Sequence, residues 1–144
     1  MPKNISTEIT INAPREKVWA ILTDFNNYYS WNPFIVQSSG QAVVGTRLVN
    51  TMMNGKGTMV FKPVVLTVKQ NEYFDWLGSL FIKGLFDGHH YFKLEDLGNG
   101  QTRLTQGENF SGILAGLLLI SIGKQTRKGF EKMNEALKER AERG

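Results

Sequence analysis

The period of the hydrophobic pattern changes several times along the chain, and each change marks a different element. Residues 6–11 alternate polar and apolar side chains, as a half-buried strand does. Over 12–25 the apolar positions follow helical spacing, and aromatic residues then lead into a second short helix that ends before Pro33. Six strand-like runs separated by Gly, Asn or Asp fill 34–110. From 111 to about 140 the helical period returns.

This order of elements predicts an α+β fold in which one long helix packs on an antiparallel sheet. The six central runs have short connections, whereas parallel pairs need long crossovers. The helix over 111–140 cannot bury its own apolar stripe, so we expect it to lie on the apolar face of a curved sheet. Pro63 lies inside the longest run, 58–70, and predicts a bend, a bulge or an edge position there. The length favours a single domain over 1–144.

The most apolar stretch of the chain, "GILAGLLLISIG" at 112–123, contains three glycines. It is too short to cross a membrane, which takes about 20 apolar residues, and basic residues follow from Lys124. We therefore expect no membrane insertion. Positions seven apart share a helix face, so Gly116 and Gly123 fall in line with Phe130. Each helix-interior glycine costs about 1 kcal/mol relative to alanine, so this line indicates either close approach of helix to sheet or space left between them.

Composition and charge narrow the possible partners. Hydrophobic residues make up 41% of the chain and charged residues 21%, as in ordinary globular proteins. The net charge is +4, but Lys and Arg alternate with Glu in the last helix, which is typical of a solvated face. A nucleic-acid surface needs an unmixed basic stripe, so we expect no nucleic-acid partner.

Cofactor and metal chemistry find no support in the sequence. The chain has no cysteine, which excludes disulfides, thiolate metal sites and cysteine nucleophiles. The two histidines, His89 and His90, are neighbours in a strand-like run and should point to opposite faces, so we expect no metal site. No nucleotide- or metal-binding motif occurs, and we expect no cofactor. The first residues lack an apolar signal segment, and we expect a cytoplasmic protein.

One pair of titratable residues is brought together by the predicted hairpin register. "LGNGQ" at 97–101 predicts a three-residue loop, Gly98-Asn99-Gly100, so that opposed residue numbers sum to 198. His90 then faces Glu108 across the strands, with Gln106 beside them, on the face turned to the helix. A buried carboxylate needs a partner, and an imidazole is a suitable one. The pair could be a self-satisfied structural contact, could orient a polar group of a ligand, or could transfer protons in catalysis.

Three segments resemble a known superfamily. They are "INAPREKVWAILTDFNNYYSWNPF" (11–34), "GLFDGHHYFKLEDLGNGQTRLTQGENFSGIL" (84–114) and "TRKGFEKMNEALKERAE" (126–142). Together they resemble the SRPBCC superfamily of START/Bet v 1-like helix-grip proteins, in its polyketide cyclase/dehydrase-like branch. The resemblance implies a curved seven-stranded antiparallel β-sheet wrapped around a long C-terminal α-helix, with two short helices after strand 1. It also implies a hydrophobic cavity between sheet and helix.

Three functions agree with this picture. The first is binding, carriage or sensing of a hydrophobic small molecule, lipid- or polyketide-like, in the cavity. The alternative is a cofactor-free polyketide cyclase or dehydratase that uses His90 and Glu108 as a catalytic acid/base pair. The third is a structural or interaction protein with a filled core. The further residues that we predict to contact a ligand are Tyr28, Trp31, Phe92, Gln106, Phe110, Gly116, Leu119 and Gly123.

Overall fold

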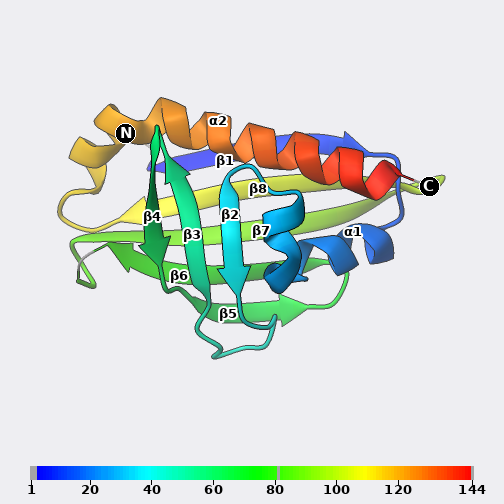
Figure 1. The fold of residues 1–144 in the computed structure, drawn as a ribbon, viewed down its shortest axis with the longest axis horizontal. Helices are drawn as coiled ribbons and strands as arrows, with labels where there is room; N and C mark the ends of the chain where they lie inside the picture. Colours follow the sequence, from blue (N-terminus) through cyan, green and yellow to red (C-terminus); the bar gives the residue numbers. More distant parts are fainter. Residues whose placement is uncertain (1–2, 81, 144) are drawn as a thin grey trace.

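The structure is a computed structural model that describes residues 3–80 and 82–143, and it folds into two antiparallel sheets and one long helix (Figure 1). In chain order its elements are β1 (Asn4–Ile11), α1 (Arg15–Leu22), the 3₁₀ helix η1 (Phe25–Ser30), β2 (Ile35–Ser39), β3 (Val49–Asn54), β4 (Gly57–Phe61), β5 (Val64–Lys69), β6 (Tyr73–Leu80), β7 (Phe86–Gly98), β8 (Gln101–Ser111) and α2 (Ala115–Glu142). The predicted α+β class, the two short helices after the first strand and the long C-terminal helix are confirmed.

The strands of the described residues form two sheets instead of a single seven-stranded one. Five of them pair in the order β1-β8-β7-β6-β5, and the other three in the order β2-β3-β4. Figure 1 shows the smaller sheet running across the strands of the larger one. The two sheets meet where Arg47 forms a β-bridge with Val64 and the Leu48 N–H donates to the Pro63 carbonyl at 2.8 Å. The sheet surface is therefore folded over on itself.

Pro63 explains why one predicted run becomes two strands. The run over 58–70 separates at this residue into β4 and β5, which belong to different sheets. Proline has no N–H to donate to a ladder and is tolerated at strand ends and edges. Both β4 and β5 lie at an edge of their sheet, so the missing donor interrupts no interior ladder.

The predicted register of the β7–β8 hairpin is confirmed. Opposed residues from Asp87–Ser111 to Asp96–Thr102 have numbers that sum to 198, and His90 lies opposite Glu108. The turn itself is shorter than expected, because β7 ends at Gly98 and β8 begins at Gln101. A bulge between Asp96 and Gly98 takes up the extra residue and keeps the register.

The long helix α2 is buried in its second half and exposed in its first. Phe130, Met133 and Leu137 are fully buried, as their spacing predicts. In contrast, several large apolar side chains just before and in its first half are exposed, namely Ile113 (86%), Leu117 (69%) and Ile120 (77%), whereas Leu118 and Leu119 are half-buried. The apolar stretch is therefore not core along its whole length. In the described part of the chain, no helix is long and apolar enough to span a membrane.

Candidate functional site

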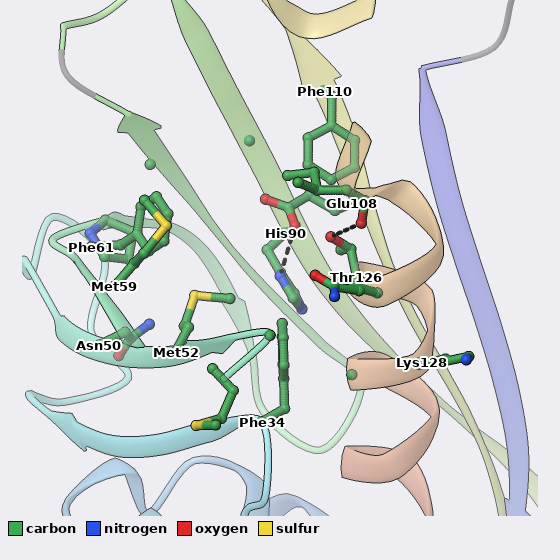
Figure 2. A pocket seen from close by; sticks show the side chains of 18 of the residues that line it. Phe34, Asn50, Met52, Met59, Phe61, His90, Glu108, Phe110, Thr126 and Lys128 are labelled. Carbon is green, nitrogen blue, oxygen red and sulfur yellow. Dashed lines mark hydrogen bonds and ion pairs between the residues drawn. The ribbon is translucent and has the colours of Figure 1, made fainter. Parts of the chain in front are cut away.

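A cavity of about 430 Å³ lies between the two sheets and the middle of α2 (Figure 2). Its wall is mostly apolar and aromatic, with polar side chains at a small number of points. The small sheet contributes Asn50, Met52, Met59 and Phe61, the large sheet contributes Trp76, Phe86, His90, Glu108 and Phe110, and α2 contributes Ile122, Gln125, Thr126 and Gly129, with Phe34 beside them. This composition suits an apolar small molecule that carries polar groups.

His90 is held in the cavity wall by aromatic rings. The side chain is 1% exposed. Its ring centroid lies 5.0 Å from that of Trp76, 4.8 Å from that of Phe92 and 4.9 Å from that of Phe130. Because these rings surround the imidazole, its plane is fixed by packing before any hydrogen bond is considered.

A buried hydrogen-bond chain runs behind His90 and starts at a backbone carbonyl. The Thr7 hydroxyl donates to the carbonyl oxygen of Gln106 at 2.9 Å, so its oxygen is free to accept from Asn134 Nδ2, also at 2.9 Å. Asn134 Oδ1 then accepts from Gln106 Nε2 at 2.6 Å. Each step fixes the orientation of the next amide, because a backbone carbonyl can only accept.

This series of hydrogen bonds fixes the tautomer of His90. With Gln106 Nε2 committed to Asn134, Gln106 Oε1 faces His90 Nε2 at 2.9 Å and must accept a hydrogen bond. His90 Nε2 therefore carries the proton that it donates, and Nδ1 is the nitrogen left with a lone pair in the neutral ring. Gln106 thus lies behind the histidine and acts on it as a positioning residue.

His90 Nδ1 faces the cavity beside a carboxylate. Among the described residues it has no hydrogen-bond partner, and Glu108 Oε1 lies 3.4 Å away. Figure 2 shows Glu108 reaching over the ring from the neighbouring strand. With the hydrogen of the neutral ring on Nε2, Nδ1 is a hydrogen-bond acceptor, as are the oxygens of a carboxylate. The pair therefore presents hydrogen-bond acceptors to a ligand hydroxyl.

Gly88 provides the room that Glu108 occupies. A Cβ at this position would lie 2.0 Å from Glu108 Oε2 and 3.0 Å from its Cδ. The Glu108 side chain is 15% exposed and lies at the cavity wall, not sealed in the core. The absence of a side chain at position 88 therefore allows the carboxylate to lie close to His90.

A polar residue on the opposite wall was not singled out from the sequence. Asn50 on β3 is 1% exposed, and the Ser38 hydroxyl lies 2.5 Å from its Oδ1. In the described chain its Nδ2 has no hydrogen-bond partner. The signal available in the sequence is its position, because Asn50 stands at the same strand parity as Leu48 and Met52, which interrupts an apolar face with an amide.

Three of the predicted site residues line this cavity together, namely His90, Glu108 and Phe110. Phe92 and Gln106 are fully buried and lie behind His90. Tyr28 and Trp31 lie outside the lining. The first is fully buried, because η1 turns its ring inward and its hydroxyl donates to the Leu22 carbonyl, and the second packs edge-on against it.

The cavity-facing part of α2 is not where the glycine line placed it. Gly116 is exposed, Gly123 and Leu119 are half-buried, and none of the three lines the cavity. A Cβ at either glycine would meet nothing within 4 Å. The prediction that Gly116, Leu119 and Gly123 line the cavity required α2 to lie on the sheet along its whole length. Instead, Ser111 extends β8, Gly112 turns with a φ of 106°, and α2 begins only at residue 115.

A third glycine in α2, Gly129, lies where the helix comes close to another segment, as the alignment of Gly116 and Gly123 suggested for those two residues. At Gly129 a Cβ would lie 2.4 Å from Cδ1 and 2.5 Å from Cε1 of Phe34. Phe34 is buried and its ring packs edge-on against Phe130, with centroids 5.6 Å apart. Helix α2 and the segment before β2 therefore meet at Gly129, in the wall of the cavity.

The second histidine belongs to a separate cluster on the outer face of the large sheet. His89 Nε2 lies 2.7 Å from Asp75 Oδ2, which also accepts from the Tyr73 hydroxyl at 2.8 Å. Burial, and then the bond to Asp75, raise the pKa of Tyr73. Asp75 is buried within this cluster. Among the described residues no group of three or more His, Asp or Glu side chains is placed to hold a metal ion.

A long helix gripped by antiparallel strands over an internal cavity defines the START-like class of helix-grip folds. Within it, the chain belongs to the family described as polyketide cyclase / dehydrase and lipid transport, whose sequence profile matches residues 2–142. The resemblance stated from the sequence is thereby confirmed. A comparison with curated protein sequences gives no match.

Solved structures with the same fold come from distant relatives. A START superfamily protein from Mycobacterium smegmatis is 21% identical with a TM-score of 0.77, covering 96% of this chain and 97% of that one. The Zhui aromatase/cyclase from Streptomyces sp. R1128 is 15% identical (TM-score 0.70, coverage 97% and 93%). A norcoclaurine synthase point mutant from Thalictrum flavum is 12% identical (TM-score 0.75, coverage 98% and 94%). These identities support a shared fold only.

Proposed function

We propose that the protein binds an apolar small molecule, lipid- or polyketide-like, in the cavity and holds a hydroxyl group of that molecule at His90 and Glu108. One observation carries the proposal, which is that the buried Nδ1 of His90 faces the cavity and has no partner among the described residues. Leaving such an atom unpaired costs about 1–3 kcal/mol. A ligand hydroxyl that donates to Nδ1 removes this cost.

The apolar part of the ligand packs against the apolar side chains of the cavity wall. Met52 and Met59 have flexible, polarisable side chains that adapt to different shapes. Phe110 and Phe86 stack on each other with centroids 5.5 Å apart and form a flat aromatic surface beside Glu108. We infer that shape selection is loose and that the polar pair sets the orientation of the ligand.

Calorimetric titration with 4-butylphenol and with butylbenzene tests this proposal, because the two probes differ by one hydroxyl. We expect the phenol to bind at least about tenfold more tightly, as a charge-assisted hydrogen bond supplies. His90→Phe and Glu108→Gln should remove this preference while butylbenzene still binds. His89→Gln and Glu95→Gln are matched controls outside the cavity and should keep it. Equal affinities for the two probes, or no binding of either, would contradict the proposal.

A second candidate function is proton-transfer catalysis without a cofactor. The fixed tautomer favours it, because the lone pair of His90 Nδ1 faces the cavity beside Glu108. In a cyclisation or dehydration, Nδ1 would remove a proton from the carbon next to a carbonyl group. The Glu108 carboxylate would stabilise the imidazolium that forms when Nδ1 takes this proton.

Hydrogen–deuterium exchange at the central carbon of 1-phenylbutane-1,3-dione separates the two functions. An enzyme of this kind should accelerate the exchange, and His90→Phe should abolish the acceleration while His89→Gln keeps it. A protein that only binds the diketone leaves the exchange rate unchanged. In that case the binding function stands alone.

A further inference from the structure

We propose that Asn50 forms a second polar subsite of the cavity, which takes a hydrogen-bond acceptor of the ligand, such as a carbonyl oxygen. The inference rests on the proposed function, since it concerns the other end of the molecule whose hydroxyl is held at His90. It narrows the ligand to an apolar molecule that carries oxygen at two separated points.

The orientation of the Asn50 amide follows from one distance. Ser38 Oγ lies 2.5 Å from Asn50 Oδ1, a separation typical of O–H···O bonds and too short for N–H···O. The hydroxyl is therefore the donor and the amide oxygen the acceptor, which leaves both N–H bonds of Nδ2 to point elsewhere. Ser38 is itself buried, so water does not compete freely for this bond.

The Asn50 amide nitrogen Nδ2 is a buried donor at the cavity wall. Asn50 is 1% exposed and lines the cavity, and in the described chain Nδ2 has no hydrogen-bond partner. In Figure 2 the amide nitrogen lies on the side of Asn50 that faces Met52, and the amide oxygen lies on the other side. A buried donor without a partner is unfavourable and rare in folded proteins, and an acceptor on the ligand satisfies it.

Asn50 and His90 lie on opposite walls with apolar surface between them. Figure 2 shows Asn50 on the small sheet, His90 on the large one, and Met52 between the two. A single polar group cannot satisfy both places. Because Nδ2 can only donate, the group that it selects is an acceptor, whereas the His90–Glu108 pair takes a hydroxyl. The two ends of the ligand are thereby distinguished, which fixes the direction in which it enters.

The test uses phenols with and without a ketone in the side chain. The probes are 4-alkylphenols and matched phenols in which one chain CH₂ is replaced by C=O at successive distances from the ring. At one chain position we expect the ketone to tighten binding to the wild-type protein about five- to tenfold. In that complex the side-chain amide ¹⁵N–¹H signals of Asn50 should shift, and the parent phenol should leave them unmoved.

The variant that removes the subsite is Ser38→Ala/Asn50→Leu, which keeps the branched shape of the Asn50 side chain and leaves no buried hydroxyl without an acceptor. It should still bind the parent phenol, and the ketone should no longer tighten binding. Ser38→Ala alone is the matched control and should retain most of that gain. The amide signals of the wild-type protein test the same contact without any substitution.

The outcomes of these titrations distinguish failure of the Asn50 subsite from failure of the proposed function. If the phenols bind and depend on His90, but no ketone position tightens binding, the Asn50 subsite is overturned and the proposed function stands. A ketone gain that persists in Ser38→Ala/Asn50→Leu overturns the subsite as well. If no phenol of the series binds the wild-type protein, the proposed function fails, and the inference that rests on it fails too.

Discussion

The three glycines inside α2 allow a comparison in which the same substitution has opposite effects. Replacement of a helix-interior glycine by alanine stabilises a helix by about 1 kcal/mol when nothing obstructs the new methyl group. At Gly123 a Cβ meets nothing within 4 Å, so the full gain should appear. Gly116 is equally open but lies in the first turn of α2, where the gain is smaller. At Gly129 the methyl group would lie 2.4 Å from the buried ring of Phe34.

The expected magnitudes follow from these distances. Overpacking of this kind costs about 1–3 kcal/mol, which offsets the helical gain and leaves Gly129→Ala between neutral and about 2 kcal/mol less stable than wild type. Gly123→Ala should raise the midpoint of thermal unfolding by about 3 °C, the shift that 1 kcal/mol gives in a chain of this length. Gly129→Ala should leave the midpoint unchanged or lower it by up to about 6 °C.

Circular dichroism during thermal unfolding measures these shifts, and titration with 4-butylphenol adds a second readout. Gly129→Ala should weaken binding, because the methyl group and the displaced Phe34 both enter the cavity wall. Gly116→Ala should leave binding unchanged. The reasoning is refuted if Gly123→Ala destabilises the protein, or if Gly129→Ala stabilises it as much as Gly123→Ala does.

Three further substitutions test the surroundings of the site and the fold. Gly88→Ala should push the Glu108 carboxylate away and weaken phenol binding in calorimetry, with little change in unfolding because that side chain can move. The hydrogen bond from Lys138 lowers the pKa of Glu142, so Glu142→Gln should be less stable than wild type at neutral pH. Urea titrations should show this difference in the free energy of unfolding becoming smaller below pH 4.5. Burial raises the pKa of Tyr28, so the wild type should lose stability as the pH rises above about 10, and Tyr28→Phe should lack this loss. At neutral pH Tyr28→Phe should be about 1–2 kcal/mol less stable than wild type, because it lacks the hydrogen bond to the Leu22 carbonyl.

The part of the site that was predicted from sequence is the part that local patterns determine. The β7–β8 register follows from strict alternation on both sides of a glycine-rich turn, which is why His90 and Glu108 were placed opposite each other correctly. Even there, the turn is one residue shorter than expected, and a bulge compensates. Pro63 marked an irregular strand, but the separation into two sheets depends on pairing between distant residues.

The rest of the site depends on long-range placement that no local pattern encodes. Helical spacing ranks the faces of α2 but does not say where along its length the helix crosses the sheet, so the cavity-facing residues lie around Ile122 and Gly129 instead of at Gly116 and Gly123. Asn50 becomes a site residue only because the small sheet folds across the large one. Gln106 was expected at the ligand, but α2 supplies Asn134 as its partner and turns it toward His90.

A crystal structure of the protein with the tightest-binding ketone-bearing phenol tests the central claim most directly. The account predicts that the phenol oxygen lies within hydrogen-bond distance of His90 Nδ1 or a Glu108 carboxylate oxygen, with the alkyl chain against Met52. Density for the phenol outside the cavity, for example on the exposed apolar face of α2 at Leu117, would contradict it. So would a phenol in the cavity whose oxygen contacts neither His90 nor Glu108.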